Sequence, residues 1–337
     1  MAKDKLTFCI FGAGRIGKLH ARNVAAHPRA RVKYIVDPIA RAAADLARQV
    51  GARTAAEAAT ALADPEIDAV VVASSTNTHV DLITASARGG KAVLCEKPID
   101  LDIKRVNRCL ADLKKYRVPV AIGFNRRFDP TNRAIQAAIR KGEVGEIEQI
   151  IITSRDPAPP PLDYIKVSGG LFRDMMIHDF DLARWLLGEE PVEVVAKASC
   201  RVDPRIGRAG DVDTAMVILR TRRGSLCHIN NSRRATYGYD QRVEVFGSRG
   251  MIRSDNLRPT TIMKSNDAAT DARDVLLPFF IERYAESYLD ETDDFIDAVL
   301  AKRKPSVGAE DGRRALMLAD AAIESHRTGK TVTVSSA

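Results

Sequence analysis

Short apolar runs alternate with alanine- and arginine-rich stretches through residues 1–122, and this alternation limits the possible folds more than any other feature. The apolar runs typical of β-strands lie at 6–12, 32–37, 69–74, 92–96 and 118–123, with a shorter one near Ala52–Thr54. Stretches of helical character, such as 38–50 and 79–90, separate them. Strands that alternate with helices in this way form βαβ units, whose parallel sheet is buried on both faces. The pattern therefore predicts an α/β domain over 1–122 with a parallel sheet.

The pattern changes after Gly123, where longer and more amphipathic strands begin. These strands are expected at 146–155, 192–203, 212–221 and 225–232, and helices are expected at 130–141, 171–187, 281–301 and 308–328. Turn signals at Arg222–Gly224 and Gly247–Gly250 predict hairpins. We predict that 123–337 forms a second α/β domain with a largely antiparallel sheet, whose last helix can pack back on the first domain. The proline-rich segment 156–170 is expected to be a functional loop, because loops of that length are otherwise uncommon.

The overall composition narrows the class of protein. A chain of 337 residues with 45% hydrophobic and 28% charged residues is typical of a globular protein with two domains. The net charge of +8 comes from Lys and Arg that are scattered along the sequence, so it does not indicate nucleic-acid binding. No apolar run approaches the roughly 18 residues that a membrane span needs.

The cysteines and the N-terminus both indicate a cytoplasmic protein. The five cysteines show no CxxC spacing, and their odd number argues against a complete set of disulfides. Cysteines used as small buried hydrophobic residues are typical of a reducing compartment. The N-terminal MAKDKLTFCIFG enters a strand-like run without the architecture of a signal peptide.

A glycine motif, 12-GAGRIG-17, follows the first predicted strand and opens a helix. In this setting Gly12 permits a tight turn, Gly14 lets the backbone approach a pyrophosphate, and Gly17 permits close packing of helix and strand. The dipole and free N–H groups at the helix N-terminus, where Arg15 and Ile16 lie, favour the phosphates. The motif predicts a Rossmann domain that binds a dinucleotide.

Asp37 indicates which dinucleotide is bound. It lies at the end of the second predicted strand, 20 residues after Gly17. A carboxylate there accepts hydrogen bonds from a ribose 2′-hydroxyl and repels a 2′-phosphate. The sequence therefore favours NAD over NADP. Arg41 could weaken this preference, although a cation on a helix surface needs no such role.

Small polar side chains follow the strand at 69–74, in 74-SSTNTH-79. Loops at the carboxyl ends of parallel strands form the ligand crevice of such a sheet. We expect Ser74, Thr76 and Asn77 to contact the dinucleotide. His79 is a further cofactor candidate, with an equally good structural role at the start of the next helix.

The run 95-CEKPID-100 places Glu96, Lys97 and Pro98 at the end of another predicted strand. Pro98 favours an extended conformation of Lys97 and removes a backbone donor. Lys97 is therefore expected at the crevice rather than on a helix surface, and Glu96 and Lys97 are candidates for cofactor binding. A strand-ending turn with surface charges would also account for the run.

These motifs together resemble the Gfo/Idh/MocA oxidoreductase family. The resemblance extends over nearly the whole chain, through 12-GAGRIG-17, 95-CEKP-98, 123-GFNRRFDP-130, 169-GGLFRDMMIHDFDLARWL-186, 237-YGYDQRVEVFGSRG-250 and 279-FFIERYAESY-288. Within the family the chain is most similar to inositol 2-dehydrogenases. The resemblance implies a Rossmann domain followed by an α/β domain whose open sheet packs between subunits, usually in a homotetramer.

The predicted helix 171–187 carries a narrow stripe of acidic and imidazole side chains. At about 100° per residue, Asp174, His178 and Asp181 fall within an arc of roughly 60° that apolar side chains flank. Three interpretations fit these residues alone: an ion pair on a helix surface, metal ligands, or a general base with its neighbour. The sequence offers no other Cys/His cluster to complete a metal site, so we expect no metal. Asp181 either supports its neighbours or is an ordinary helix charge.

The stripe indicates catalysis when it is combined with Lys97 and the family resemblance. Oxidation of a secondary alcohol needs a base for the hydroxyl proton and a cofactor for the hydride. His178 is the expected base, Asp174 is expected to orient the substrate or the imidazole, and Lys97 is expected to stabilise the developing alkoxide. The family carries these three roles at the same motif positions, and Asp174 and His178 also count as substrate contacts.

The remaining substrate candidates follow from the resemblance. In inositol dehydrogenases the second arginine of the NRRF motif contacts the substrate, which points to Arg127. Asp156, Tyr237 and Tyr239 are further candidates, each with an equally good structural role. No basic cluster surrounds these positions, so a neutral polyol is favoured over a phosphorylated sugar.

The sequence therefore predicts NAD-dependent oxidation of a cyclitol, myo- or scyllo-inositol, to the ketone. Two alternatives stay open at this point. One is a dehydrogenase of another sugar, such as a glucose-type pyranose. The other is an NAD-binding regulator that has kept the fold without the chemistry, against which the joint retention of Lys97, Asp174 and His178 argues.

Overall fold

The structure, a computed structural model, describes residues 4–335. Contacts between residues divide the chain into two compact units. The first unit contains the residues up to Phe128 together with Glu286–Leu316, and the second contains Asp129–Ala285 together with the residues from Met317 onward. The sequence-based division at 122/123 places Glu286–Leu316 in the second domain, whereas its contacts place it in the first unit.

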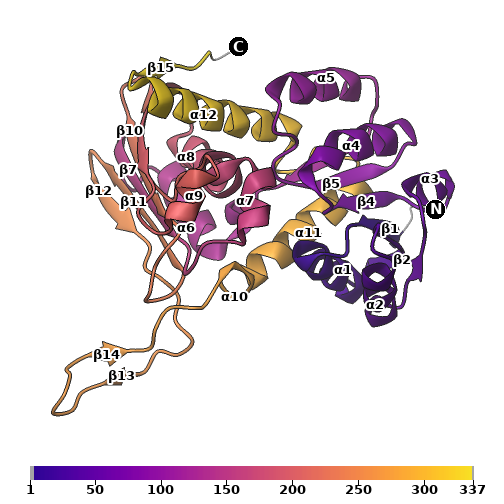
Figure 1. Cartoon of the computed structure of the whole chain (residues 1–337), viewed down its shortest axis with the longest axis horizontal. Helices are drawn as coiled ribbons and strands as arrows, with labels where there is room; N and C mark the ends of the chain where they lie inside the picture. The colour runs from indigo at the N-terminus through magenta and orange to yellow at the C-terminus, as the bar shows by residue number, and fades with distance from the viewer. Residues whose placement is uncertain (1–3, 336–337) are drawn as a thin grey trace. The chain divides into compact units, whose positions relative to one another are not determined.

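A six-stranded sheet forms the framework of the first unit (Figure 1). Its strands, in the order of their neighbours, are β3 (Arg53–Thr54), β2 (Ala30–Val36), β1 (Leu6–Phe11), β4 (Ala69–Val72), β5 (Ala92–Glu96) and β6 (Val120–Gly123). Every neighbouring pair is parallel, so the predicted Rossmann sheet is confirmed. The strand order reverses between β1 and β4, and sheets of this kind bind their ligands at the carboxyl ends of the strands that flank such a reversal.

Helices cover both faces of this sheet, and its central strands β1 and β4 are therefore buried along their whole length. They are α1 (Arg15–Ala26), α2 (Ala40–Val50), α3 (Ala58–Ala63), α4 (His79–Arg88), α5 (Ile103–Leu113) and α11 (Ala285–Leu300). In Figure 1, α1 and α2 lie on one side of the sheet and α4 and α5 lie on the other. Phe295 and Ile296 of α11 are 1% and 0% exposed in the same hydrophobic core as Phe8 and Leu46. This packing explains why Glu286–Leu316 belongs to the first unit.

A seven-stranded sheet forms the framework of the second unit. Its strands, again in the order of their neighbours, are β12 (Gly250–Arg253), β11 (Asp240–Gly247), β7 (Ile147–Arg155), β10 (Leu226–Ser232), β9 (Thr214–Thr221), β8 (Pro191–Ser199) and β15 (Val332–Thr333). β7 and β10 run parallel, and the other neighbouring pairs are antiparallel. The predicted largely antiparallel sheet is confirmed, and both predicted turns connect hairpin strands.

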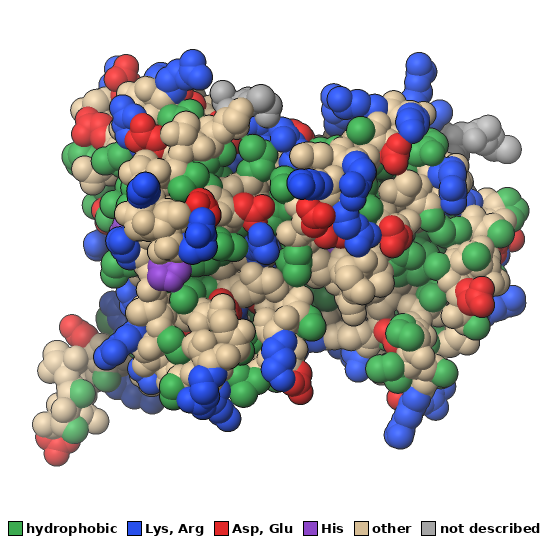
Figure 2. Space-filling view, turned by 45° about the horizontal axis from the view of Figure 1, so that its top comes forward, with side chains coloured by type: hydrophobic (Ala, Val, Ile, Leu, Met, Phe, Trp, Pro, Cys, Tyr) green, Lys and Arg blue, Asp and Glu red, His purple; other side chains and the backbone are tan. Residues whose placement is uncertain are grey.

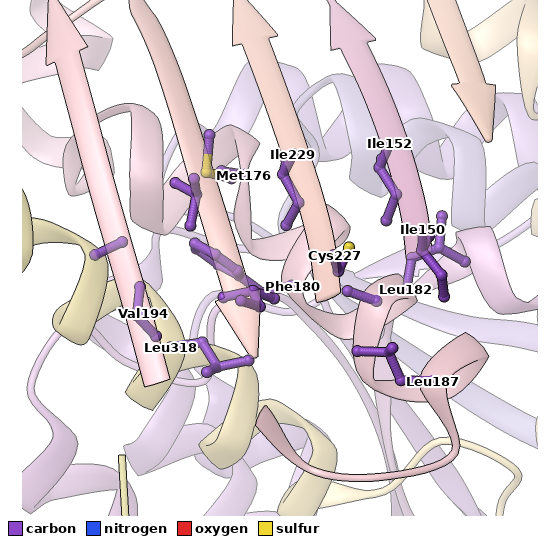
Figure 3. Close-up of a cluster of buried hydrophobic side chains, with 14 of the residues drawn as sticks. Ile150, Ile152, Met176, Phe180, Leu182, Leu187, Val194, Cys227, Ile229 and Leu318 are labelled. Carbon is purple, nitrogen blue, oxygen red and sulfur yellow. The ribbon is translucent and has the colours of Figure 1, made fainter. Parts of the chain in front are cut away.

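Helices pack on one face of this second sheet. The helices with residues in the second unit are α6 (Pro130–Arg140), α7 (Leu162–Ser168), α8 (Ile177–Leu187), α9 (Pro204–Arg208), α10 (Phe280–Arg283) and the later part of α12 (Ala309–Thr328). Figure 3 shows the core between helices and sheet, to which Phe180 and Leu182 of α8, Leu318 of α12, and Ile150 and Ile229 of the strands contribute. All five side chains are at most 2% exposed.

The strands of the second sheet alternate between a buried face and an exposed face. In β9, Val217 and Leu219 are fully buried, whereas Met216 and Ile218 are 57% and 48% exposed. A strand that packs on one side of its sheet shows this alternation. The exposed face nevertheless carries large apolar side chains rather than only polar ones.

Two segments of the second unit differ from the sequence-based expectation. The segment 156–170 is not a loop throughout, because Leu162–Ser168 forms helix α7 directly after Pro161, a residue that fits the start of a helix. A hairpin of β13 (Met263–Lys264) and β14 (Ala272–Arg273) was not predicted. It extends away from the sheet in Figure 1.

Candidate active site

Two glycines of the turn after β1 pack directly against backbone. Gly12 has a φ of +103°, and a Cβ at this residue would lie 2.3 Å from the carbonyl oxygen of Ala73. A Cβ on Gly17 would lie 2.1 Å from the carbonyl oxygen of Gly12. A Cβ on Gly14 would meet no atom of the described residues within 4 Å. Gly12 and Gly17 therefore close the turn, and Gly14 leaves space in front of the N–H groups that begin α1.

Asp37 joins the glycine turn to the end of β2. Its Oδ2 accepts a hydrogen bond from the backbone N–H of Ala13 at 2.7 Å, and its Oδ1 accepts one from the N–H of Ile39 at 2.8 Å. A carboxylate has about four acceptor sites, so Asp37 keeps capacity for ribose hydroxyls. The side chain of Arg41 is 93% exposed, and its Nε lies 4.0 Å from Oδ2 of Asp45. The ion pair of Arg41 is thus with Asp45, whereas Asp37 accepts hydrogen bonds from the backbone.

His79 joins the loop after β4 to the loop after β5. Its ring is 1% exposed, with Nδ1 2.8 Å from the carbonyl oxygen of Pro98 and Nε2 3.1 Å from that of Ser74. Burial lowers the pKa of His79, although the two carbonyl groups oppose the shift. The neutral ring donates to one carbonyl at a time. The structure thus places His79 behind the predicted cofactor loop, where it ties Ser74 to Pro98.

The other predicted cofactor residues of these loops lie nearer the surface. Arg15 and Ile16 open α1, and Arg15 is exposed while Ile16 is half-buried. Thr76 and Asn77 belong to the short helix η1 (Thr76–Thr78), and Asn77 is exposed. Arg15 and Ile16 follow β1, and Thr76 and Asn77 follow β4. These are the two strands that flank the reversal of strand order.

The carboxylate of Glu96 points into the interior of the first unit. Its Oε1 lies 2.7 Å from Nε2 of His20 on α1, and the His20 ring packs edge-on against Tyr288 of α11 with a centroid distance of 5.7 Å. A Cβ on Gly123 would lie 3.1 Å from Oε2 of Glu96. Glu291 of α11 is also buried, and neither of its oxygens has a hydrogen-bond partner within residues 4–335. Sequence reasoning missed His20 and Glu291, because no local spacing relates them to Glu96.

The surroundings of Glu291 favour its protonated form. Burial raises the pKa of Glu291 well above its ordinary value, and the neighbouring carboxylates of Glu96 and Asp294 raise it further. Two carboxylates that share a buried site resist simultaneous ionisation.

Lys97 and Arg127 follow neighbouring strands of the first sheet. Lys97 comes directly after β5 and is half-buried, and its peptide bond to Pro98 is cis. Arg127 lies in the short helix η2 (Asn125–Phe128) after β6, and its Nη2 donates to Oδ1 of Asp311 at 2.8 Å. Because β5 and β6 are parallel neighbours, Lys97 and Arg127 follow the sheet at the same edge.

The stripe that contains Asp174 and His178 lies on a helix that changes its period. Leu171–Met175 forms a π-helical turn, and α8 begins only at Ile177. The expectation of one regular α-helix over 171–187 was therefore wrong, because the segment begins with a π turn. This turn shifts Asp174 relative to His178. Both side chains are half-buried. Single π turns within helices occur frequently at functional sites.

Three polar side chains that sequence reasoning missed surround Asp174. The hydroxyl of Tyr164 in α7 donates to Oδ1 of Asp174 at 2.9 Å. Nη2 of Arg233, after β10, lies 3.8 Å from Oδ2 of Asp174 and 3.7 Å from Oδ2 of Asp211. These residues come from three separate segments, so no spacing in the sequence indicates their convergence.

Asp179 and Asp181 contact other parts of the second unit. Asp179 is fully buried and accepts a hydrogen bond from Nδ2 of Asn231 at 2.9 Å. Oδ1 of Asp181 lies 3.4 Å from Nη1 of Arg184, which also donates two hydrogen bonds to Glu190. These contacts give Asp181 a structural role on α8, one of the two alternatives that the sequence left open.

The remaining substrate candidates of the second unit have different surroundings. The hydroxyl of Tyr237 donates to Oδ2 of Asp240 at 2.7 Å and accepts from Nη1 of Arg155 at 2.9 Å. Tyr239 is 5% exposed and lies in an aromatic cluster, with neighbouring ring centroids at 5.7 and 6.1 Å. Asp156 is half-buried at the end of β7.

The described part of the chain contains neither a cluster of metal ligands nor a membrane-spanning helix. No group of three or more His, Cys, Asp or Glu side chains in residues 4–335 could hold a metal ion. No described helix combines the length and apolar character that a membrane crossing requires. On the face drawn in Figure 2, Lys and Arg side chains are interspersed with Asp and Glu rather than gathered in one patch.

The two units together define a class of protein. In the first unit the open space at Gly14, the N-terminus of α1 and the Asp37 carboxylate fit the pyrophosphate and ribose of a dinucleotide. In the second unit Asp174 and His178 are half-buried, and a carboxylate and an imidazole are groups of the kinds that enzymes use for proton transfer. A nucleotide domain combined with groups for acid–base chemistry is typical of a dinucleotide-dependent oxidoreductase.

Comparison with protein families narrows this class. Residues 6–124 match the model of the oxidoreductase family described as its NAD-binding Rossmann fold. Residues 136–334 match the model described as the C-terminal alpha/beta domain of the same family. The chain belongs to the Gfo/Idh/MocA oxidoreductase family, which confirms the resemblance seen in its motifs, and its first domain is an NAD-binding domain.

Individual relatives cover almost the whole chain. It is 50% identical over 320 residues to the inositol 2-dehydrogenase of Rhizobium meliloti strain 1021, which covers 94% of this chain and 96% of the relative. It is 47% identical over 332 residues to the myo-inositol 2-dehydrogenase of Thermotoga maritima, with coverage of 96% and 97%. The crystal structure of scyllo-inositol dehydrogenase from Lactobacillus casei with bound NAD(H) and scyllo-inositol has a TM-score of 0.91 and 28% identity, over 98% of this chain and 99% of that chain.

Replacing Gly14 with alanine should separate cofactor binding from folding. Its Cβ meets no atom of the described chain, so the thermal midpoint should stay within about 2 °C of wild type. The methyl group would occupy the approach of the pyrophosphate, so calorimetric titration should show NAD affinity reduced by about tenfold or more. Gly12→Ala and Gly17→Ala are the matched controls, because each should lower the thermal midpoint sharply or prevent folding. Unchanged NAD affinity in Gly14→Ala would contradict this division of roles.

Replacing Glu291 with glutamine should stabilise the protein at alkaline pH. Unfolded chains release this proton above the ordinary value of 4.5, whereas the folded protein keeps it because its pKa is raised. Stability is therefore lost as pH rises above about 4.5 toward the folded-state pKa, by at most about 1.4 kcal/mol per pH unit. Glu291→Gln should raise the thermal midpoint at pH 8 and change it little at pH 4.5.

The control for this substitution is Glu286→Gln, an exposed position on the same helix. Thermal unfolding of both variants and the wild type is measured from pH 4.5 to pH 9. The Glu286 variant should follow the wild-type pH dependence. A Glu291 variant that is less stable than wild type at pH 8 would show that the carboxyl is ionised in the folded protein.

Proposed function

We propose that this protein oxidises one secondary hydroxyl of a cyclitol, myo- or scyllo-inositol, to a ketone. The observation that carries the proposal is the similarity to inositol 2-dehydrogenases, at 50% and 47% identity over nearly the full length. Lys97, Asp174 and His178 supply the groups that the reaction needs. The dispersed charges of the candidate site, with acceptors such as Asp156 and a donor such as Arg127, suit a neutral polyol.

Each of the three residues performs one part of the proposed reaction. NAD, when bound, supplies the acceptor for the hydride. His178 acts as general base and accepts the proton of the reacting hydroxyl. Lys97 donates a hydrogen bond to the same oxygen and stabilises the negative charge that develops on it. Asp174 orients the imidazole or the substrate, and the hydrogen bond from Tyr164 restrains this carboxylate.

The first unit holds the cofactor in this proposal. The backbone at Gly14, Arg15 and Ile16 binds the pyrophosphate, and Asp37 binds the ribose hydroxyls. Gly12 and Gly17 shape the turn. In this proposal Ser74, Thr76, Asn77 and Lys97 contact the nucleotide. His79 binds the backbone of Ser74 and Pro98 and so connects the two loops. Glu96 pairs with His20 and fixes the end of the strand that precedes Lys97.

The proposed substrate contacts are Arg127, Asp156 and Tyr237, in addition to Asp174 and His178. Arg127 is tethered by Asp311, which limits its motion and prepares it for a fixed hydroxyl. The Tyr237 hydroxyl is restrained between Arg155 and Asp240. Tyr239 is buried, so its contribution comes mainly from the aromatic packing that holds the Tyr237 segment.

The proposed activity is tested by following NADH formation with a panel of myo-inositol, scyllo-inositol, glucose and xylose. Turnover should be highest with an inositol and with NAD rather than NADP. His178→Ala should lower kcat by at least about 10²-fold, because the hydroxyl proton loses its acceptor, while calorimetry still detects NAD binding. His27→Ala, which removes a half-buried histidine that is paired with Asp293 and is not among the proposed site residues, is the control and should keep wild-type kcat.

Each result of the panel has a defined meaning. Preferred turnover of glucose or xylose would replace the cyclitol by a pyranose substrate. No turnover of any polyol with either cofactor would favour a regulator that binds NAD without catalysis. Full activity of His178→Ala would remove the assigned base.

We also propose that the protein assembles as a homotetramer through the exposed face of the second sheet. Large apolar side chains lie on this face, at Ile151, Met216, Ile218, Leu226, Phe246 and Met251, which are 36–57% exposed. Contiguous exposed apolar surface typically marks a protein interface. The alternation of β9 keeps this face distinct from the core that the helices cover.

Light scattering coupled to size exclusion tests this assembly. The wild type should have four times the mass of the chain. Met216→Asp combined with Ile218→Asp should give a smaller species, because two desolvated charges would oppose contact at the centre of the face. Val167→Asp, at an exposed position on α7, should leave the mass unchanged. A monomeric wild type would contradict the proposal.

A cytoplasmic location completes the proposal. All five cysteines are free thiols, and four of them are buried. Burial raises the pKa of Cys95 well above its ordinary value, which keeps this thiol unreactive. Free buried cysteines suit a reducing compartment.

A further inference from the structure

Arg233 is a buried cation beside the candidate catalytic helix. It is 1% exposed, and its Nε and Nη2 make no hydrogen bond among the residues that the structure describes. The Nη2 atom lies between two carboxylates, 3.8 Å from Oδ2 of Asp174 and 3.7 Å from Oδ2 of Asp211. A buried guanidinium costs several kcal/mol unless opposite charges compensate it. The two carboxylates provide this compensation, and they come from segments of the chain other than that of Arg233.

Asp211 also anchors the π turn that carries Asp174. Its Oδ1 accepts a hydrogen bond at 3.0 Å from the backbone N–H of Leu171, the first residue of the turn. Gly170 precedes the turn with a φ of +80°, and a Cβ at Gly170 would lie 2.5 Å from the same Oδ1. The absence of a side chain at Gly170 therefore lets Asp211 reach the turn. One carboxylate thus contacts both the start of the turn and the cation that faces Asp174.

We propose that Arg233 and Asp211 are positioning residues, which form a buried brace that holds Asp174 in place and sets the charge beside His178. The inference rests on the proposed function, because it gives the brace a role in the oxidation assigned to Asp174 and His178. Neither Arg233 nor Asp211 touches the reacting atoms in this proposal. Both act through Asp174, Arg233 by its charge and Asp211 by its charge and its hydrogen bond to the π turn.

The brace has a signed electrostatic consequence. Burial raises the pKa of Asp211, the backbone N–H groups of Leu171 and Val212 and the charge of Arg233 lower it, and the charge of Asp174 raises it. Removal of the Arg233 charge favours protonation of every titratable group that faces it. Removal of the Asp211 charge has the opposite effect on the remaining groups. A purely structural brace would not produce opposite shifts.

The experiment compares the pH dependence of kcat/KM for inositol in Arg233→Met, Arg233→Lys, Asp211→Asn and wild type. Arg233→Met should move the acid limb to higher pH by about one unit and lower kcat about tenfold, with the KM for NAD unchanged. Asp211→Asn should move the limb to lower pH by about half a unit, since the amide oxygen can still accept from Leu171. Arg233→Lys keeps the charge and should leave the limb near its wild-type position.

Arg184→Met is the matched control, because it removes another buried arginine, paired with Asp181 and Glu190. It should lower the thermal midpoint without moving the acid limb. Limbs of Arg233→Met and Asp211→Asn that coincide with wild type, or that move in the same direction, would overturn the proposal. Should Arg233→Met not fold, Asp211→Asn and Arg233→Lys decide the question: the limb should move to lower pH in the first and stay near wild type in the second, and a limb at the wild-type position in both would overturn the proposal.

A readout that does not depend on turnover separates this inference from the proposed function. Absence of inositol oxidation by the wild type would defeat the proposed function alone. Titration of the His178 imidazole by NMR, with its resonance assigned by His178→Asn, then tests the brace in the same variants. Its midpoint should rise in Arg233→Met and fall in Asp211→Asn, and an unchanged midpoint in both would refute the brace.

Discussion

The close backbone contact at the reversal of strand order is the constraint on which the nucleotide domain depends. Gly12 and Gly17 lie where any Cβ would overlap a carbonyl oxygen, the first against the chain after β4 and the second against Gly12 itself. The helix α1 can begin so near the sheet only because these two side chains are absent. Its N-terminus therefore lies beside the open space at Gly14. Two of the three glycines thus serve packing, and the cofactor site follows from that packing.

A different constraint governs the π turn and helix α8 of the second unit, since several of their charged side chains are buried or half-buried. Each buried charge needs a partner, and the partners come from separate directions: Asn231 for Asp179, Arg184 for Asp181, and Arg233 with Tyr164 for Asp174. Side chains that look equivalent in a helical projection therefore differ in their roles. Asp179 and Asp181 are buried in the packing of the second unit, whereas Asp174 and His178 are half-buried.

The features predicted from sequence were those encoded by nearby residues. The parallel strands, the hairpin turns and the glycine motif depend on local patterns, and each lies where the sequence indicated. Helix α11 belongs to the first unit because Phe295 reaches a core formed by residues almost the whole chain earlier. Leu171, the first residue of the π turn, donates a hydrogen bond to Asp211, whose carboxylate approaches across Gly170. Such contacts between distant segments leave no periodicity in the sequence, so the brace at Asp174 and the His20–Glu96 pair could not be predicted.

Buried acids make the stability of the two units depend on pH in opposite directions. Burial by itself would raise the pKa of Asp240, but hydrogen bonds from Arg242, Asn256 and Tyr237 outweigh it and hold the pKa below its ordinary value. The second unit therefore gains stability from Asp240 above its ordinary value of about 3.8 and loses it in acid. The first unit carries the opposite dependence, because burial raises the pKa of Glu291, so the stability associated with this carboxyl is lost as pH rises above its ordinary value of 4.5.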